Sequence, residues 1–470
     1  MRSSFPERVE TLVVCPSISF PSVELRKITG IEHYEERMLY LVLALRDPGM
    51  RVVYLTSMPV DPDIVDYYLS FVDAEGAGAR LHLLSVGNPE PRALTAKLLE
   101  RPGLVDRVRD LVDDPARAYV LPFNITSWEV YLAEALGLPV YGPPLEAVPL
   151  GSKSGGRRVA RAAGVDVLDG AEDLWSEAEV ERAIADLRRR RPGLRAAVIK
   201  LNNGFSGQGN AILEAASLRT PLRDSPTVFC ASEESWASFA GKIEAEGAVV
   251  EELVRGRGVS SPSAQVRIEP GGRFSIVSTH DQILGGPDDQ VYLGCRFPAR
   301  PGYRRLISEG ARGIARELAR RGVVGPFGVD FLVVPAEGGR RVYLTEINLR
   351  VGGTTHPFEM ARLATGGRYD EATGELAAGG RAKHYVATDN LRSQSYVGLA
   401  PRAVISALGD SGLAFDANTG TGVTVHLLGA LASYGKMGVS CIGNSYEEAE
   451  DIYRFALECV EGVAASARAG

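Results

Sequence analysis

Cysteine is scarce in this sequence, and its few copies are widely spaced. The chain has five cysteines in 470 residues, an odd number, and no C-x-x-C pair occurs. A disulfide framework or a cysteine-based zinc site needs paired, closely spaced cysteines, so both are disfavoured. A reducing cytoplasm is therefore the expected location for a chain that carries Cys15, Cys230, Cys295, Cys441 and Cys459.

Long hydrophobic runs and clustered positive charge are also lacking. A membrane span needs about 18 consecutive apolar residues, and the apolar stretch at residues 12–15 is too short even for a signal-peptide core. The 52 Lys and Arg residues are outnumbered by 59 Asp and Glu residues, which gives a formal net charge of -7. Because nucleic-acid phosphates are bound by clustered basic residues, we expect neither a membrane nor a nucleic-acid partner.

The dinucleotide-binding fingerprint G-x-G-x-x-G does not follow the first predicted strand, although the surrounding pattern is α/β. In residues 1–148, helical spacing alternates with apolar stretches that predict strands at 12–14, 51–55, 81–86 and 119–123. Such alternation predicts a mainly parallel sheet. Since the chain has 470 residues, about two to four domains are expected, of which residues 1–148 form the first.

Residues 149–253 are predicted to form a second domain, in which helices follow Ser152 and Ser176. Its strands are expected at 196–201, 210–213 and 248–254. The change from a regular strand–helix alternation to paired strands around a glycine-rich loop marks the domain boundary.

Residues 254–382 are predicted to contain antiparallel hairpins that turn near 270–272 and 337–339, with one long helix between them. Residues 366–382 are rich in Gly and Ala and are expected to be a mobile segment. Residues 383–470 return to a strand, a turn and a helix, which predicts a small C-terminal α+β unit.

Asp330, Glu346 and Asn348 are the strongest candidates for a metal site. Alternate residues of a strand face the same side, so Glu346 and Asn348 point together. The turn near 337–339 sets Asp330 opposite Glu346 or its neighbour, where paired Cβ atoms lie about 4.5–5.5 Å apart. Magnesium prefers such hard oxygen ligands and would relieve the repulsion between the two carboxylates. The alternative interpretation is a pair of exposed acids on a hairpin.

A glycine-rich loop after Lys200 is the second candidate site. Its backbone N–H groups can close over a polyphosphate, and Lys200 can bind a phosphate as a point charge. Lys153, where a loop enters a helix, is a further candidate because lysine is scarce, with seven copies in the chain. A plain hairpin and a solvated lysine are the alternatives. The loop residues expected to bind nucleotide are Gly204, Ser206, Gly207, Gln208 and Gly209.

The order of these motifs over roughly residues 110–360 resembles the ATP-grasp superfamily of carboxylate–amine ligases. The resemblance implies an α/β ATP-grasp architecture with a parallel-sheet pre-ATP-grasp domain, two nucleotide-clamping lobes (149–253 and 254–382) and bound ATP and Mg²⁺. It also implies an inter-lobe strand whose backbone reads adenine, at Glu251, Glu252 and Leu253.

Narrower resemblances suggest the reaction. Glu346-Ile347-Asn348-Leu349-Arg350, followed by His356-Pro357, is similar to the E-x-N-x-R…H-P run of the biotin-carboxylase branch, which implies that Arg350 faces the reacting acyl group. The stretches around Lys153, Lys200 and 345–357 resemble the peptide ligases of pheganomycin-type antibiotic biosynthesis. That resemblance implies joining a carboxylate donor, such as a guanidino phenylglycine-type acid, to the amino group of a peptide through an acyl phosphate.

Further expectations concern the substrates and the assembly. Arg296 follows the hairpin that should line the acyl pocket and is a second catalytic candidate. The C-terminal unit is expected to complete the acceptor side, with Lys436 and His384 as candidate contacts. Residues 255–261 offer no acid or histidine for the ribose, unlike many ATP-grasp relatives. A homodimer is a hypothesis for the assembly.

Two other functions compete with the peptide ligase. The first is a biotin-carboxylase-like enzyme that makes carboxyphosphate; it would share Glu346, Asn348 and Arg350, but no biotin-acceptor segment is seen in the sequence. The second is a non-catalytic nucleotide-binding protein, which should have lost a metal ligand or a lysine. All of these residues are present, so an enzyme is favoured.

Overall fold

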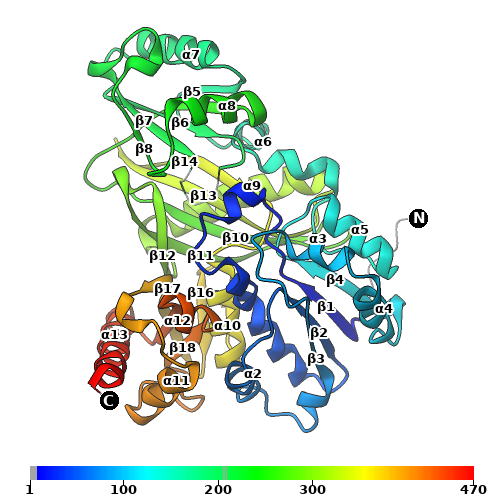
Figure 1. Ribbon diagram of the computed structural model, residues 1–470. Coiled ribbons are helices and arrows are strands. Elements are labelled where there is room, and N and C mark those ends of the chain that lie inside the picture. Colours follow the sequence, from blue (N-terminus) through cyan, green and yellow to red (C-terminus); the bar gives the residue numbers. More distant parts are fainter. Residues whose placement is uncertain (1–7, 205–206, 208, 470) are drawn as a thin grey trace.

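The computed structural model describes residues 8–469, apart from 205, 206 and 208 (Figure 1). The described residues form three sheets, of four, five and ten strands. The five-stranded sheet and its helices stand apart at the top of Figure 1, above the ten-stranded sheet and the two terminal parts of the chain. This arrangement agrees with the expected α/β architecture.

The N-terminal sheet is fully parallel, in the order β3-β2-β1-β4, as the strand–helix alternation predicts. Successive side chains of a strand face opposite sides, so Leu12 and Val14 join one hydrophobic core while Val13 and Cys15 join another. The strands are β1 (Thr11–Cys15), β2 (Arg51–Thr56), β3 (Leu81–Ser85) and β4 (Ala118–Pro122).

Helices cover both faces of this sheet. One face is covered by α3 (Leu94–Leu99), α4 (Pro102–Asp110) and α5 (Ser127–Leu136). On the other face lie the 3₁₀ helix η1 (Ile31–Arg46) and α2 (Pro62–Leu69). A short helix, α1 (Ser22–Leu25), follows β1 and reaches toward the five-stranded lobe.

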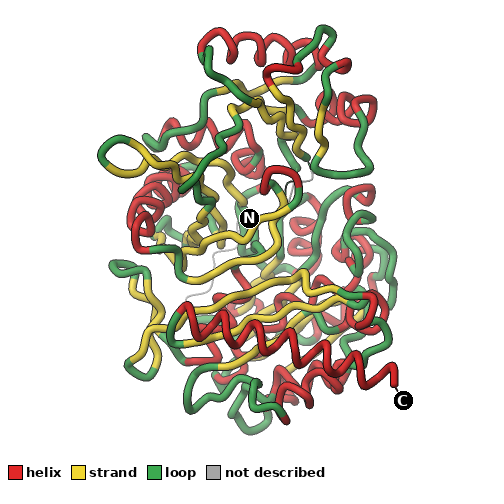
Figure 2. The backbone as a smooth tube through the Cα atoms, turned by 90° about the vertical axis from the view of Figure 1, so that its left-hand side faces the viewer, coloured by secondary structure: helices red, strands yellow, loops and turns green. Residues whose placement is uncertain are grey.

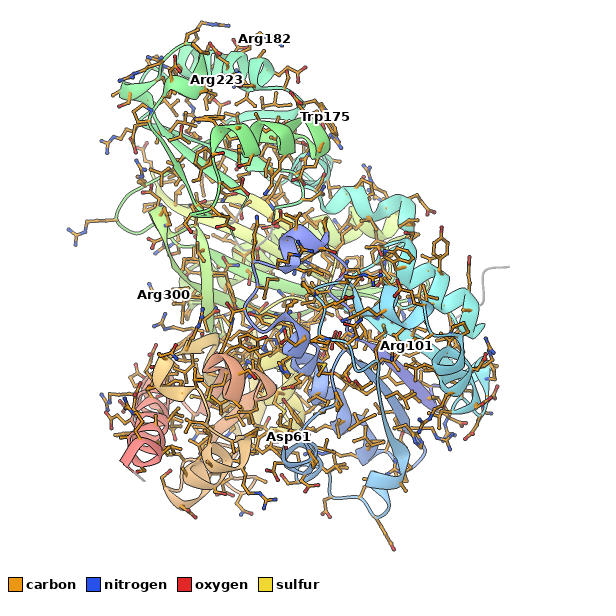
Figure 3. All side chains as sticks on the ribbon, in the orientation of Figure 1. Asp61, Arg101, Trp175, Arg182, Arg223 and Arg300 are labelled. Atoms are coloured by element: carbon orange, nitrogen blue, oxygen red, sulfur yellow. The ribbon has the colours of Figure 1, made fainter. Side chains whose placement is uncertain are left out.

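The five-stranded sheet is antiparallel, in the order β5-β9-β6-β7-β8. Its helices are α6 (Lys153–Ala162), α7 (Glu177–Arg190) and α8 (Trp236–Glu246). Polar residues of this lobe, including Arg182 and Arg223, lie at its outer edge together with Trp175 (Figure 3). The strands are β5 (Gly170–Leu174), β6 (Ala196–Leu201), β7 (Asn210–Glu214), β8 (Thr227–Phe229) and β9 (Ala248–Glu252).

The ten-stranded sheet contains both predicted hairpins, β10–β11 and β13–β14. Helix α9 (Pro301–Arg320) packs on it through a stripe that includes Ile307, Ala311 and Ile314. Helix α10 (Thr355–Thr365) follows the second hairpin. The strands up to this point are β10 (Pro262–Ile268), β11 (Phe274–Gly285), β12 (Val291–Phe297), β13 (Gly325–Ala336) and β14 (Gly339–Asn348).

The expectation of a mobile segment at 366–382 is wrong. These residues contain β15 (Arg368–Asp370), β16 (Glu375–Ala378) and the start of β17 (Arg381–Arg392). Gly379 and Gly380 both have positive φ angles, of 57° and 74°, and turn the chain between β16 and β17. Such two-residue turns favour glycine, so the glycines mark hairpin turns. The expected boundary at residue 382 falls inside β17.

The C-terminal unit continues the same sheet. Strand β17 pairs with β12 on one side and with β19 on the other. The elements after β17 are α11 (Pro401–Asp410), β18 (Gly422–His426), α12 (Gly429–Tyr434), β19 (Lys436–Gly443) and α13 (Tyr446–Ala469). No helix in the described part of the chain is long and apolar enough to cross a membrane.

One hydrophobic core joins the two ends of the chain. It contains Leu12 and Tyr54 of the N-terminal sheet together with Val425, Val439 and other residues of the C-terminal unit. In Figure 2 the helix that ends at C lies across strands in the lower half of the molecule. The C-terminal unit therefore packs on η1 and α2, which cover this face of the N-terminal sheet.

An ion-pair cluster links the N-terminal domain to the five-stranded lobe. Lys27 Nζ lies 2.9 Å from Glu24 Oε2 and 3.2 Å from Glu234 Oε1. Lys242 on α8 binds Glu24 Oε1 at 3.1 Å and also binds Glu234. The four side chains are 5–24% exposed. We call this cluster the Glu24–Lys242 latch.

Candidate active site

The predicted acidic hairpin forms in the expected register. Asp330 on β13 pairs directly with Glu346 on β14, and Gly328 pairs with Asn348. The Asn348 side-chain amide donates to Asp330 Oδ2 at 3.1 Å. The three side chains therefore converge on one face of the sheet and all line the same cleft.

Asp330 lies in surroundings that disfavour the ionised form of its carboxyl group. Burial and the charge of Glu346 raise the pKa of Asp330 to about 7, while Arg350 and Lys153 act in the opposite direction. A divalent cation would reverse this penalty, because it favours the ionised form of its carboxylate ligands. Two carboxylates and an amide oxygen are the donors that Mg²⁺ prefers, so the residues fit the expected metal.

Lys153 connects this hairpin to the glycine-rich loop. Ser152 caps α6 by accepting a hydrogen bond from the Gly155 N–H, and Lys153 is the first residue of the helix. Its Nζ donates to Glu346 Oε1 at 2.7 Å and to the backbone oxygen of Gly204 at 2.9 Å. Lys153 thus lies between the proposed metal ligands and the loop that follows Lys200.

Glycine is required in the loop by close backbone contacts. A Cβ on Gly204 would lie 2.9 Å from the Cα of Gly209, and a Cβ on Gly207 would lie 1.9 Å from the backbone oxygen of Gln290. Gly204 and Gly207 line the cleft. Ser206 and Gln208, which are also predicted to bind nucleotide, lie outside the described residues.

Lys200 lies on β6 and lines the cleft, and the carboxylate of Glu251 balances its positive charge. Its Nζ donates to Glu251 Oε2 at 2.8 Å, and Glu251 also accepts from Arg157. Burial alone would raise the pKa of Glu251, but Lys200 and Arg157 lower it. The Glu251 side chain therefore anchors Lys200, whereas Glu252 and Leu253 line the cleft at the end of β9.

The cleft has a volume of about 440 Å³ and draws residues from all parts of the fold. Its wall includes the apolar side chains Leu168, Val198, Leu253 and Leu332 as well as charged groups. The N-terminal domain and the C-terminal unit add a second group of wall residues: Phe20, Arg37, Phe123, Asp389, Asn390 and Lys436.

Arg350 and Arg37 lie at this second part of the wall. The Arg350 guanidinium carbon is 5.8 Å from the centroid of the Phe123 ring, and that of Arg37 is 5.1 Å from the same centroid. Arg37 Nη1 also lies 3.3 Å from Asp389 Oδ2. Sequence reasoning predicts Arg350 but not Arg37 or Asp389, because neither lies in a recognisable local motif.

Arg296 and His384 are not brought to the cleft. Arg296 lies on β12, and its guanidinium forms an ion pair with Glu450 of α13. Neither Arg296 nor His384 occurs among the described residues that line the cleft. Lys436, the other C-terminal candidate, does line it and donates to the Tyr34 hydroxyl. The geometry therefore gives no support to a catalytic role for Arg296.

The three-part architecture around this cleft is that of the ATP-grasp fold. Residues 39–138 match the family described as Pre ATP-grasp domain, residues 223–372 match IQCH-like ATP-grasp, and residues 403–456 match PGM1 C-terminal domain. A biotin carboxylase of Campylobacter jejuni aligns with a TM-score of 0.58 and 14% identity, over 96% of this chain and 91% of that chain. An N5-carboxyaminoimidazole ribonucleotide synthetase in complex with ADP aligns with a TM-score of 0.54 and 14% identity, over 98% and 99%.

A relative of higher identity defines the family. The L-propargylglycine–L-glutamate ligase of Streptantibioticus cattleyicolor is 32% identical in an alignment of 466 positions, which covers 96% of this chain and 94% of the relative. The chain therefore belongs to the family of ATP-grasp ligases that includes this enzyme. IQ motif-containing protein H of Danio rerio is more distant, at 19% identity over 78% of this chain and 40% of the relative. The similarity to biotin carboxylases shows the fold alone.

Proposed function

We propose that this protein is an ATP- and Mg²⁺-dependent ligase that joins the carboxylate of one amino acid to the amino group of a second amino acid or short peptide. The observation that carries the proposal is the meeting of Asp330, Glu346 and Asn348 with Lys153 in a cleft that also contains Arg350. The membership in an ATP-grasp ligase family supports the same reaction.

One end of the cleft suits a nucleotide. Leu168, Val198, Leu253 and Leu332 offer apolar surface for a purine. Lys200 and Lys153 supply positive charge for phosphates near the glycine-rich loop. Asp330, Glu346 and Asn348 would hold Mg²⁺, which neutralises charge on the terminal phosphates when it is bound.

The residues of the chain mainly position the reactants. Lys153 and Lys200 orient the phosphates so that the donor carboxylate attacks the terminal phosphorus and gives an acyl phosphate and ADP. The amine then attacks the acyl carbon, and phosphate leaves. Arg350 lies beside the acidic hairpin and stabilises the oxyanion that develops in this step. Alignment of reactants and exclusion of water account for most of the rate gain.

The cationic part of the wall favours an acceptor that carries a carboxylate. Arg350 donates to a backbone carbonyl and Lys436 to the Tyr34 hydroxyl, and both face the cleft. An acidic amino acid such as glutamate would satisfy them, in keeping with the name of the 32% identical ligase. Lys436 and Asp389 support our expectation that the C-terminal unit completes the acceptor side. We propose a guanidino acid as a candidate for the carboxylate donor, and not as the acceptor that Arg350 and Lys436 bind.

Oxygen-18 transfer tests the proposed reaction. Small α-amino acids labelled in the carboxylate, together with a phenylglycine-type guanidino acid, are incubated with ATP, Mg²⁺ and glutamate or glutamyl peptides. We expect the label in inorganic phosphate and an amide product by mass spectrometry. Label in AMP would contradict an acyl phosphate. ATP turnover that needs bicarbonate and no amine would instead support the carboxylase alternative.

We also propose a cytoplasmic location and a homodimeric assembly. The five cysteines are all free, three of them buried, which suits a reducing cytoplasm. A homodimer stays a hypothesis, and light scattering coupled to size-exclusion chromatography tests it directly.

A further inference from the structure

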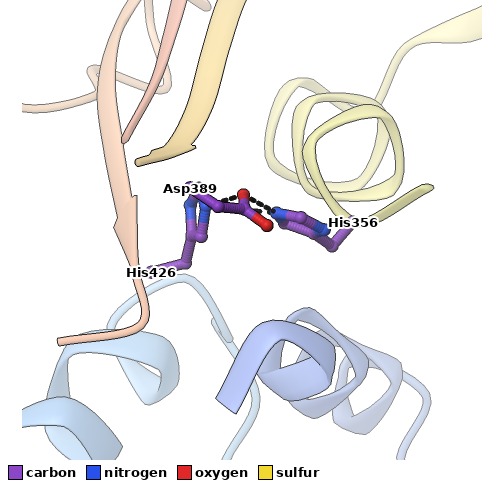
Figure 4. A group of neighbouring side chains, drawn as sticks. All are labelled: His356, Asp389 and His426. Atoms are coloured by element: carbon purple, nitrogen blue, oxygen red, sulfur yellow. Dashed lines mark hydrogen bonds and ion pairs between the residues drawn. The ribbon is translucent and has the colours of Figure 1, made fainter. Parts of the chain in front are cut away.

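Two histidines and an aspartate form a compact buried cluster beside the cleft. His356 lies on α10, Asp389 on β17 and His426 on β18 (Figure 4). One potential ligand atom from each lies within 4.8 Å of the others. The side chains of His356, Asp389 and His426 are 4%, 10% and 6% exposed. Residues this far apart in sequence have converged on one point inside the protein.

Hydrogen bonding alone does not satisfy this geometry. Asp389 Oδ1 lies 3.0 Å from His356 Nε2 and 2.9 Å from His426 Nε2, and the two nitrogens are 3.1 Å apart. If both nitrogens carry a proton and donate to the carboxylate, two donors face each other. If one nitrogen is unprotonated, its lone pair faces the carboxylate oxygen. At most two of the three contacts are therefore hydrogen bonds.

A metal ion bound to the two Nε2 atoms and to Oδ1 would accept a lone pair from each of them at once. Ligand atoms about 2.1 Å from a metal are separated by about 3.0 Å when they occupy one face of an octahedron, and by about 3.4 Å in a tetrahedron. The observed separations of 2.9–3.1 Å match the facial arrangement. Imidazole with one carboxylate suits zinc, iron and related ions better than Mg²⁺, which prefers oxygen alone.

The surroundings hold the ligands in this arrangement. Arg37 binds the other oxygen of Asp389, Oδ2, at 3.3 Å, which leaves Oδ1 to the histidines. Gly438 lies opposite His426 in the β18–β19 ladder, and a Cβ there would be 2.0 Å from His426 Nε2.

We propose that His356, Asp389 and His426 bind a divalent transition-metal ion of the zinc or iron class, separate from the magnesium site at Asp330 and Glu346. The ion would tie α10 to β17 and β18, and through Arg37 to the N-terminal domain. Because Asp389 also lines the cleft, the site stiffens the wall proposed to receive the acceptor.

Metal titration of the full-length, tag-free protein tests the proposal. After chelator treatment, Zn²⁺ is added in excess Mg²⁺ and followed by calorimetry, and bound zinc is counted by elemental mass spectrometry. We expect one zinc ion per chain and a higher unfolding temperature with zinc. Co²⁺ in place of zinc should give visible absorption bands of nitrogen–oxygen coordination. Failure of the wild-type protein to bind zinc stoichiometrically overturns the proposal.

Matched variants assign the site. His426→Ala should weaken zinc binding by more than about 100-fold, since loss of even an outer partner of a metal ligand costs about 10–100-fold. Gly438→Ala should weaken it by displacing the His426 ring. His384→Ala removes a histidine from β17 outside the cluster, and Glu346→Gln alters the magnesium site; both should bind zinc as the wild type does. Equal zinc affinity in His426→Ala and wild type would refute the assignment.

Discussion

Glu346 is bound by Lys153 and pairs with Asp330 across the hairpin. Glu346→Gln keeps the size of the side chain but removes the charge that would hold Mg²⁺. We expect ATP-dependent amide formation to fall by about 10²–10³-fold, the scale of losing one partner that stabilises the transition state, with little change in unfolding temperature. Steady-state assays at several Mg²⁺ concentrations measure this.

The control for this variant lies on the same hairpin. Glu337→Gln changes an exposed acid at the turn between β13 and β14, so its activity should equal that of the wild type. Undiminished activity of Glu346→Gln with normal magnesium dependence would remove the hairpin from the proposed mechanism.

Glu35 makes stability depend on pH. Its buried carboxylate accepts from the N–H and the Oγ of Ser57, both at 2.6 Å. Burial nevertheless raises the pKa of Glu35 from 4.5 to about 7. Between these values the unfolded chain loses the proton while the folded protein keeps it, so this group's contribution to stability falls as pH rises. Above about pH 7 the folded carboxylate is also ionised, and the loss is complete.

Glu35→Gln removes this titration. The unfolding temperature of the variant minus that of the wild type should therefore rise between about pH 4.5 and about pH 7 and stay level above. Thermal unfolding across this range, with exposed Glu75→Gln as the control, measures the difference. A difference that does not vary with pH would show that Glu35 titrates normally.

Local motifs explain which site residues the sequence predicts. Asp330 and Glu346 are recognisable because hairpin pairing follows from a nearby turn, and Lys200 because it precedes a glycine-rich loop. Arg37 and Asp389 are 352 residues apart, and no pattern near either one predicts their contact. Arg296 is the converse case: its position after a hairpin predicts a place at the acyl pocket, but it does not reveal that Glu450 of a distant helix binds the side chain.

Among the secondary-structure elements, periodicity predicts strands well and turns less well. The four parallel strands follow from short apolar stretches, and the two hairpins follow from their turn residues. The same approach fails for residues 366–382, because β15 and β16 are short and the glycines that flank them resemble those of a flexible segment. Strand β15 pairs with β16, and β16 pairs with β17, and sequence periodicity does not predict such pairing.

The Glu24–Lys242 latch couples α8 to the N-terminal domain, so it opposes opening of the lobe that carries the glycine-rich loop. Such a lobe must open to admit nucleotide. Salt screens partly buried ion pairs less than exposed ones, so raising ionic strength from about 0.05 M to about 0.5 M should speed hydrogen exchange in α8 only modestly. Glu234→Gln removes the charge of an acceptor shared by Lys27 and Lys242. In this variant, amide hydrogens of α8 should exchange faster than in the wild type already at low salt.

A control variant separates the latch from general effects on the lobe. Glu177→Gln breaks an ion pair with Arg223 that lies entirely within the five-stranded lobe. Its exchange in α8 should match that of the wild type. Identical exchange in Glu234→Gln and wild type at low salt would show that the latch does not restrain the lobe.

For the whole molecule, the shared core makes the C-terminal unit indispensable. A chain that ends after Arg392 lacks fourteen buried residues of this core, and ten of them are Val, Leu or Met, such as Val425, Val439 and Val460. Each of these ten side chains contributes about 1.5–3 kcal/mol when buried, so their sum reaches or exceeds the usual stability of about 5–15 kcal/mol. We expect no soluble, cooperatively unfolding product, as judged by yield and calorimetry.

The matched truncation ends after Ala464 and removes only residues beyond the buried part of α13. It should stay soluble and unfold near the wild-type temperature. A soluble, cooperatively folded chain that ends after Arg392 would show that the N-terminal sheet is stable without its C-terminal cover.

The same core also determines when, during translation, the N-terminal domain can complete its packing. One face of the N-terminal sheet packs against α3, α4 and α5, which leave the ribosome soon after their strands. The other face is covered by η1 and α2, and the outer sides of these helices wait for the C-terminal unit, including β18. At about 5–20 residues per second, the roughly 370 residues between β2 and β18 take about 20–70 s to make. Throughout that time the sides of η1 and α2 that later meet the C-terminal unit stay uncovered, so the nascent domain is a natural client for ribosome-associated chaperones.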